Sequence, residues 1–224
     1  MIEPKLPSSM HTPAYVLDMP SLKHNLETAR HLKNETGIKI LLATKAWAMP
    51  VAFPIMRAIL DGTTASGEFE ARMGHDEFGK EVHVYSPAYT AEEIDRLIQL
   101  ADHIYFNSVS QFTKYAQKVK NAGLKVGLRI NPGYSSATLG GHLYDPCAPG
   151  SRFGLTKEDF PKIPWEEVDV FHVHALCEAR EEGSVGLIQH VANNFAKEIQ
   201  HVKAVNFGGG HFFNRPGYKI EKLI

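Results

Sequence analysis

The sequence predicts an α/β fold in which parallel strands alternate with helices and curl into a barrel. From residue 38 onward, seven short apolar runs alternate with segments that repeat apolar residues at helical spacing. Polar or glycine-rich residues follow one strand after another, and this is the face on which β/α barrels build active sites. An open doubly wound sheet would also place ligands there. We favour the barrel because seven successive units come close to the eight that a barrel requires.

The elements follow one another with no sign of a domain boundary. Residues 1–13 contain three prolines and are expected to form a lead-in, with one barrel domain over residues 14–224. A short strand is expected at residues 15–17. Asp18 can cap the helix that follows, and Gly37 ends it.

Two further helix starts carry the signature of a capping box, Thr90 with Glu93 and Ser108 with Gln111. A long segment, residues 131–164, interrupts the alternation, and loops of that length are commonly functional. A helix is expected within residues 185–199. The seven strands are expected at residues 38–42, 63–65, 82–85, 103–106, 124–130, 168–174 and 204–207.

Composition excludes several classes of protein. Hydrophobic residues make up 43% and charged residues 22% of the 224, which is typical of a soluble globular domain. A formal net charge of −1 argues against nucleic acid or an anionic membrane as the partner. Cys147 and Cys177 form no disulfide framework, so we expect a reducing, cytoplasmic location. We also expect no secretory signal and no membrane span, since no apolar run approaches ~20 residues.

Lys45 is the first candidate for chemistry. It stands just after the expected strand at residues 38–42. A desolvated lysine loses its proton more easily and becomes a nucleophile toward a carbonyl cofactor. The alternative is an ordinary lysine whose ammonium group reaches solvent from the end of a strand.

Three consecutive glycines, residues 208–210, follow the last expected strand. Glycine lets the backbone come close to an anion with its amide groups pointing at it. In a late unit of a barrel this pattern indicates a phosphate site. The alternative is a simple turn.

His172 and His174 are two residues apart on one strand and therefore share a face. They could be a hydrogen-bonded pair in the core. They could also bind a metal, completed by Glu178, His190 or His211, although none of these has a diagnostic spacing. The third interpretation is an imidazole stacked on a flat aromatic cofactor.

Arg129 and Arg152 are fixed cations expected on the same face as Lys45. Arg152 lies in a Ser-Arg-Phe-Gly sequence beyond the loop rich in proline and glycine. Each could instead be a surface ion-pair partner. Cys147 and Cys177 are expected to be buried structural residues.

Taken together, these motifs resemble a known family. Lys45, Arg152, His174 and residues 208–210 fall in the order seen in fold-type III pyridoxal-phosphate enzymes, the group of alanine racemase and the ornithine and diaminopimelate decarboxylases. The resemblance runs from about Thr12 to the end of the chain.

Two motifs narrow the resemblance to the carboxynorspermidine (carboxyspermidine) decarboxylases. Tyr-Asp-Pro-Cys-Ala-Pro-Gly-Ser-Arg at residues 144–152 is similar to their Asn/Asp-Pro-Cys-Ala-Pro-Gly-Ser-Arg sequence. His-Ala-Leu-Cys-Glu at residues 174–178 resembles their His-x-Leu-Cys-Glu, where ornithine decarboxylases have His-x-Gly-Ser. Residues 206–211 also match.

The resemblance implies a TIM-type (β/α)8 barrel of the alanine racemase fold. Members of the family continue beyond this length with an eighth strand and a C-terminal β domain, which contribute a Glu for the pyridine nitrogen, a Cys and contacts across a homodimer. We therefore expect about seven of the eight strands here, without the β domain. We further expect residues 1–224 by themselves to lack turnover and to self-associate through unpaired strand edges.

The function implied is pyridoxal-phosphate-dependent decarboxylation of carboxynorspermidine or carboxyspermidine to norspermidine or spermidine, a step of polyamine biosynthesis. Lys45 would hold the cofactor through a Schiff base and His174 would stack on its ring. No metal is expected. The other implied contacts are Gly208, Gly209 and Gly210 to the phosphate, Arg129 and Arg152 near the cofactor, and Glu178 and His211 to the small-molecule carboxylated polyamine.

Two alternatives stay open at this point. One is a barrel-only protein that binds pyridoxal phosphate without turnover. The other is a metal-dependent barrel hydrolase that uses His172 and His174, although it leaves Lys45 and the three glycines unexplained.

Overall fold

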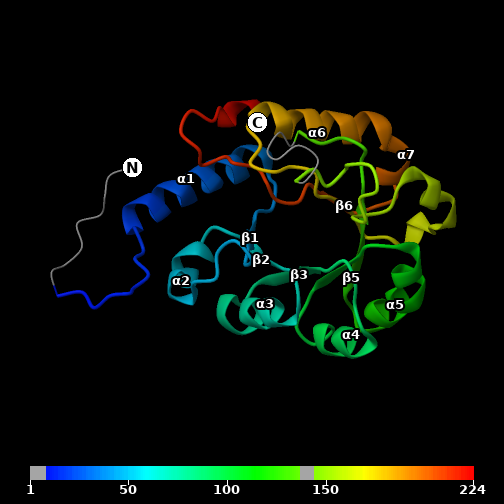
Figure 1. Ribbon diagram of the computed structural model, residues 1–224, viewed down its shortest axis with the longest axis horizontal. Coiled ribbons are helices and arrows are strands. Elements are labelled where there is room, and N and C mark those ends of the chain that lie inside the picture. Colours follow the sequence, from blue (N-terminus) through cyan, green and yellow to red (C-terminus); the bar gives the residue numbers. More distant parts are fainter. Residues whose placement is uncertain (1–8, 137–143) are drawn as a thin grey trace.

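The computed structural model describes residues 9–136 and 144–224 (Figure 1). Seven strands form one sheet whose spatial order is the order along the chain, and every neighbouring pair is parallel. The strands are β1 (Leu41–Ala43), β2 (Gly62–Ala65), β3 (Glu81–Tyr85), β4 (His103–Phe106), β5 (Lys125–Ile130), β6 (Val170–Val173) and β7 (Ala204–Asn206).

This topology confirms the partial barrel. A doubly wound sheet reverses its strand order at a switch point, whereas here the order runs from β1 to β7 without reversal. In Figure 1 the strands form an arc, and α2 to α5 lie on its convex side. Within the described residues, β1 and β7 each pair with one strand, so the sheet is curled but open.

The helices begin and end largely where the sequence predicts. Asp18 accepts a hydrogen bond from Ser21 N at 3.2 Å, and Gly37 ends the first helix in the left-handed conformation (φ 69°). The helices are α1 (Met19–Thr36), α2 (Phe53–Met56), α3 (Glu68–Met73), α4 (Ala91–Leu97), α5 (Val109–Asn121), α6 (Glu181–Asn194) and α7 (Ala196–Ile199). Short 3-10 turns span Pro50–Ala52, Lys157–Lys162, Trp165–Glu167 and Ile220–Lys222, and a π-helical turn spans Gly74–Phe78.

One predicted capping box is complete and the other is half formed. Thr90 and Glu93 exchange both hydrogen bonds at the start of α4, with lengths of 3.1 and 2.7 Å. Ser108 caps α5 by accepting from Gln111 N at 3.3 Å, but the Gln111 side chain accepts from Asn107 N instead.

Three expected elements differ from the structure. Residues 15–17 are not a strand, because they have no strand to pair with, and Tyr15 is 96% exposed. The strand predicted at residues 38–42 corresponds to β1, which starts later, at Leu41, and ends at Ala43, while Ile38 is exposed. The helix predicted within residues 185–199 starts earlier, at Glu181, and is divided at Phe195.

The main core lies on the convex side of the sheet. Outward-facing side chains of β3 to β6 pack against apolar faces of α4, α5 and α6. A second cluster joins α1, α2 and the turn at Gly74–Phe78 around Leu42 of β1. The fully buried side chains that face outward include Val84, Ile104, Phe106, Val126, Leu128, Phe171 and Val173.

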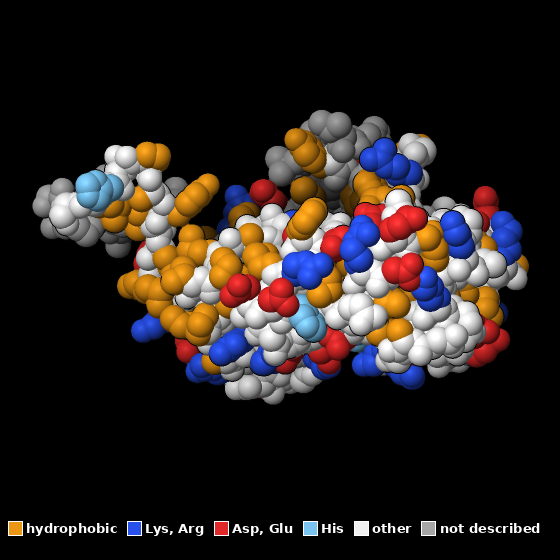
Figure 2. Space-filling view, turned by 90° about the horizontal axis from the view of Figure 1, so that it is seen from below, with side chains coloured by type: hydrophobic (Ala, Val, Ile, Leu, Met, Phe, Trp, Pro, Cys, Tyr) orange, Lys and Arg blue, Asp and Glu red, His pale blue; other side chains and the backbone are white. Residues whose placement is uncertain are grey.

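Figure 2 shows one face of the surface. Lys, Arg, Asp and Glu side chains are intermixed over it, with no single basic stripe, and hydrophobic side chains gather toward the end that carries the N-terminal segment. The mixed charge agrees with the net charge of −1. Among the described residues, no helix combines the length and the apolar character needed to cross a membrane.

Candidate functional site

The candidate residues meet at the edge of the sheet where the strands end. Lys45 follows β1, Tyr85 ends β3, Arg129 lies one residue from the end of β5 and His174 follows β6. The glycines at residues 208–210 follow β7 soon after. Because all strands are parallel, these ends lie on one side of the partial barrel, as active sites do in this fold class.

Lys45 is exposed, which corrects the expectation of a desolvated amine. β1 ends two residues earlier, and the amides of Ala46 and Trp47 both donate to the Ala43 carbonyl at 3.0 and 3.1 Å. This turn carries the Lys45 side chain beyond the buried part of the strand. Its ammonium group still lies close enough to the His174 ring to help lower the pKa of that histidine.

His174 is half-buried, and its pKa is lowered to about 3. Burial is the largest cause, followed by the positive charges of Arg129, Lys45 and His211. The imidazole is therefore neutral at ordinary pH. A Cβ added at Gly209 would lie 3.8 Å from two atoms of this ring, so the glycine loop passes directly over one edge of His174.

Arg129 is buried, with 6% of its surface exposed. Its guanidinium carbon lies 4.7 Å from the ring centres of both Tyr85 and Phe153, in cation–π geometry. One of its nitrogens donates to the His174 carbonyl at 3.1 Å. Because its contacts are aromatic faces and a carbonyl, the surface ion-pair alternative is wrong for Arg129, which positions the backbone that carries His174.

Arg152 is exposed, but its backbone is held firmly against the end of β4 and β5. Its carbonyl accepts from the Asn107 amide nitrogen at 2.9 Å, and Gly154 N donates to Asn107 Oδ1 at 2.8 Å. Tyr85 donates to the same oxygen at 2.7 Å. Gly154 has φ 85°, and a side chain there would collide with Asn131 N at 2.7 Å. The Ser-Arg-Phe-Gly sequence therefore has a packing role next to β5.

The three glycines are also explained partly by close packing. Gly208 has φ 68°, and a Cβ there would lie 2.9 Å from the Cα of His174; Gly210 has φ 90° and lies against the Leu176 carbonyl. The Gly208 amide donates to Asn206 Oδ1 at 2.8 Å, so it is already used and does not point at an anion. The predicted anion contact thus depends on the amides of Gly209 and Gly210.

Glu178 and His211 lie on adjoining segments, because Ala179 and His211 form a parallel β-bridge. Glu178 is exposed, with the unusual positive φ of 47°. His211 Nδ1 lies 3.0 Å from Ser184 Oγ, and burial lowers the pKa of this histidine. The structure therefore places the segments that carry these two predicted substrate contacts side by side.

The structure does not support the metal-hydrolase alternative. His172 is buried on the concave face, with its ring centre 5.0 Å from that of Tyr105, and it meets His174 edge-on at 6.0 Å. In the part of the chain that the structure describes, the group of three or more side chains spaced to hold a metal is Glu81, His83 and His103, not these two histidines.

Sequence reasoning assigned no role in the site to Tyr85, Asn107 and Asn206, although each lies within one residue of the end of a predicted strand. The rule that selected Lys45 would have selected them too. Asn206 Oδ1 holds the glycine loop, and its amide nitrogen donates to Tyr105 at 3.3 Å.

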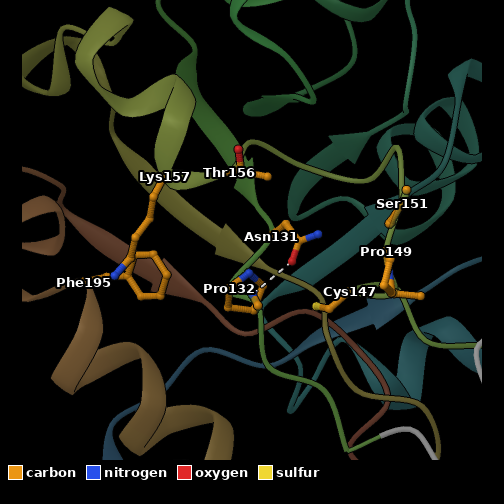
Figure 3. A pocket seen from close by; sticks show the side chains of 11 residues that line it. Asn131, Pro132, Cys147, Pro149, Ser151, Thr156, Lys157 and Phe195 are labelled. Atoms are coloured by element: carbon orange, nitrogen blue, oxygen red, sulfur yellow. Dashed lines mark hydrogen bonds between the residues drawn. The ribbon is translucent and has the colours of Figure 1, made fainter.

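A cavity of about 380 Å³ opens beside this site rather than in it (Figure 3). Figure 3 places Asn131 and Pro132 between Phe195 and Lys157 on one side and the loop of Cys147 on the other. Burial raises the pKa of Cys147 to about 11, and its thiol donates to the Tyr134 carbonyl. Cys147 and Cys177 are half-buried rather than buried as expected, and the raised pKa of Cys147 makes its thiol a poor nucleophile. The residues around the cavity are 131–133, 147–151, 156, 157 and 195.

Comparison with known proteins finds relatives that match almost the whole chain. A carboxynorspermidine/carboxyspermidine decarboxylase from Campylobacter jejuni is 38% identical over 215 residues, 96% of this chain. The chain is homologous to the carboxynorspermidine/carboxyspermidine decarboxylases. It spans about 55% of the length of that relative. A carboxyaminopropylagmatine decarboxylase from Synechocystis is 36% identical over 217 residues, 97% of this chain and 56% of the relative. No protein-family model matches.

Solved structures agree with this homology. Carboxynorspermidine decarboxylase from Campylobacter jejuni, complexed with norspermidine, superposes with a TM-score of 0.86 at 35% identity, over 96% of this chain and 55% of that one. Diaminopimelate decarboxylase from Helicobacter pylori gives a TM-score of 0.75 at 18% identity, over 96% of this chain and 59% of that one, which shows the shared fold alone.

Proposed function

We propose that the protein to which this chain belongs is a pyridoxal-phosphate-dependent decarboxylase of carboxynorspermidine or carboxyspermidine, which releases carbon dioxide and leaves norspermidine or spermidine. One observation carries the proposal. Lys45, His174 and Gly209 meet at one edge of a partial barrel whose curated relatives, at 36–38% identity, decarboxylate carboxylated polyamines.

The residues present fit the cofactor. Gly209 passes over one edge of the His174 ring, and a Cβ there would lie against the ring at 3.8 Å. With no side chain at Gly209, the loop backbone itself borders the ring, so its amides can approach a flat group stacked on the ring face. The amides of Gly209 and Gly210 are candidates to meet its phosphate, and the exposed Lys45 amine is accessible to its aldehyde.

When bound, pyridoxal phosphate supplies an electron sink for the electron pair that remains on carbon after carbon dioxide leaves. The neutral His174 ring offers a stacking surface that adds no positive charge. Arg129 fixes the His174 backbone by donating to its carbonyl oxygen at 3.1 Å. We expect Arg152, exposed beside Tyr85, to contribute to the same end of the site.

For the substrate, we propose that Glu178 binds a cationic amine and that His211 lines the same region. A carboxylated polyamine carries several positive charges, so it needs acidic partners. The Synechocystis relative favours carboxyaminopropylagmatine as a second candidate substrate, since a guanidinium group at the far end would also pair with a carboxylate. A homodimer in the cytoplasm remains our prediction, which sedimentation of the purified protein and cell fractionation would test.

The direct test is to incubate the whole purified protein to which this chain belongs with pyridoxal phosphate and measure carbon dioxide released from each of the three substrates. We expect turnover of about 1 s⁻¹ or more with at least one of them. Borohydride reduction and peptide mapping should place the pyridoxyl mass on Lys45. Lys45→Ala should abolish both signals, whereas Lys23→Ala, exposed on α1, should change neither. Labelling of Lys45 without turnover would favour the binding-protein alternative.

A second test concerns Glu178. Glu178→Gln should lower kcat/KM for the carboxylated polyamine roughly tenfold to a hundredfold, the effect of losing one charged hydrogen bond. Glu158→Gln is the matched control, since Glu158 is an exposed glutamate in the Lys157–Lys162 turn and is not one of the candidate site residues. Equal kinetics for the Glu178 variant and the control would refute the assigned contact.

A further inference from the structure

A second cluster of ligating side chains lies at the opposite end of the sheet, where the strands begin. Glu81 and His83 share the concave face at the start of β3, and His103 is the first residue of β4. His83 and His103 are register partners, and their rings stack with centres 3.8 Å apart and planes 12° apart. We propose that Glu81, His83 and His103 form a binding site for a divalent transition-metal ion such as Zn²⁺.

The decisive observation is the state of His103. Only 6% of this residue is exposed, and neither of its ring nitrogens has a hydrogen-bond partner among the described residues. Buried polar atoms are normally paired, because leaving one without a partner costs free energy. A cation bound by one of these nitrogens would give that atom a partner and reduce the cost, and a neutral imidazole is the form that binds metals.

The spacing is close to what coordination requires. One ligand atom from each of the three residues lies within 4.8 Å of the others, and Glu81 Oε2 is 3.2 Å from His83 Nε2. Ligands of a four-coordinate Zn²⁺, each about 2.0–2.1 Å from the ion, lie about 3.4 Å apart. The Glu81–His83 pair already has this separation. The His103 ring must turn out of its stacked position so that a nitrogen comes closer, by up to about 1.4 Å, from within 4.8 Å to about 3.4 Å.

A supporting shell surrounds two of the three ligands. His83 Nδ1 lies 2.7 Å from the Tyr105 hydroxyl, which in turn accepts from Asn206. This contact fixes His83 with Nε2 toward Glu81, as partners of metal-binding histidines commonly do. Lys39 Nζ donates to Glu81 Oε1 at 2.5 Å. The remaining oxygen, Oε2, faces His83 and would bind the ion.

The donor set decides the class of metal. Two imidazoles and one carboxylate suit Zn²⁺ and neighbouring first-row ions, whereas Mg²⁺ and Ca²⁺ prefer oxygen ligands alone. The Glu81 side chain is 29% exposed, which gives an ion access from solvent. The site lies at the other end of the strands from Lys45, and none of its three ligands belongs to the proposed decarboxylase site. It also departs from the sequence-based expectation of no metal.

The test uses untagged purified protein dialysed against a chelator and then titrated with Zn²⁺ alone. We expect one ion per chain, and Co²⁺ in its place should give visible absorption bands. His103→Leu should weaken Zn²⁺ binding about 100-fold or more, and Tyr105→Phe about 10- to 100-fold, as for other supporting residues. His75→Leu, at an exposed histidine in the Gly74–Phe78 turn, should bind as the unchanged protein does.

A thermal measurement guards against misfolded variants. Zn²⁺ should raise the Tm of the unchanged protein and of His75→Leu, but not that of His103→Leu. If His103→Leu does not fold, Glu81→Gln keeps the size of the side chain and should lose the same Zn²⁺-dependent rise. Absence of stoichiometric binding, or equal Zn²⁺ affinity in the unchanged protein and a folded His103→Leu or Glu81→Gln variant, would overturn the proposal.

Discussion

The two faces of the same curled sheet differ sharply in chemistry. On the convex face, side chains such as Ile104 and Phe171 are fully buried against helices. On the concave face, the alternate positions of the same strands carry His83, Tyr105 and His172. Parallel strands buried on both faces usually read as continuous apolar runs. The alternation here separates a face that stabilises the fold from a face that holds polar, titratable groups.

This separation has an electrostatic consequence. On the concave face, burial is the first cause that lowers the pKa of His83, His103, His172 and His174. All four rings are therefore neutral at ordinary pH, and several are available as ligands or stacking surfaces. The convex face has apolar packing in their place, so the two faces should respond differently to mutation and to acid.

The largest expected effect is on the convex face. Phe171→Ala should lower the free energy of unfolding by about 3–5 kcal/mol, because it leaves a cavity among Trp165, Phe195 and the strand. Phe69→Ala is the matched control, since Phe69 is 86% exposed, and it should change stability by less than about 0.5 kcal/mol. Urea denaturation of both variants measures the difference, and similar losses would contradict the assignment of the core.

The second expected effect is acid sensitivity of the concave face. Unfolded imidazoles protonate near pH 6.5, whereas His103 and His174 have folded pKa values of about 3. The unfolded state therefore binds more protons between these values, so the free energy of unfolding falls as pH falls below about 6.5. Each such histidine lowers the free energy of unfolding by about 2 kcal/mol at pH 5, because the loss is about 1.4 kcal/mol per pH unit below 6.5.

Urea denaturation between pH 7 and pH 5, with protein from which a chelator has removed any metal, tests this acid sensitivity. His103→Leu should remove about 2 kcal/mol of the acid-induced loss, since leucine does not titrate. His75→Leu, an exposed control, should leave the pH dependence as it is. A free energy of unfolding that stays level from pH 6.5 to pH 5 would show that the concave face is not desolvated.

A smaller effect is expected at the rim between the two faces. Asn107→Ala removes the side chain that binds the Arg152 carbonyl, Gly154 N and the Tyr85 hydroxyl. We expect a loss of about 1–3 kcal/mol in the free energy of unfolding, because three groups, two of them in part-buried hydrogen bonds, lose their partner. Asn34→Ala, exposed on α1, should have little effect. If the two variants are equally stable, the Ser-Arg-Phe-Gly segment is not anchored through Asn107.

The smallest expected effect lies on the outside of the barrel. Thr90→Ala removes the N-cap of α4 and should cost about 1 kcal/mol without changing the pH dependence of stability. Thr90→Ser keeps a hydroxyl at the same position and should restore most of the loss. A shifted pH dependence would mean that α4 and the concave face are coupled, which would contradict a separate response of the two faces to mutation and acid.

Local sequence determined much of this structure by itself. The alternation of apolar runs predicted all seven strands, and β4 has the predicted bounds. Asp18, Gly37 and Thr90 mark helix ends as their side-chain and backbone chemistry requires. The motifs at residues 144–152 and 174–178 predicted the decarboxylase homology. These signals are readable because each depends on residues close together in the chain.

Only the tertiary structure decided the surroundings of the candidate residues. The exposure of Lys45 follows from where β1 ends and how the chain turns, and that end is set by pairing with β2. The stacking of His83 on His103 depends on the register of two strands twenty residues apart. Residue type and spacing predict which side chains share a face, but burial and pairing between distant segments decide whether an imidazole is neutral and an amine is accessible.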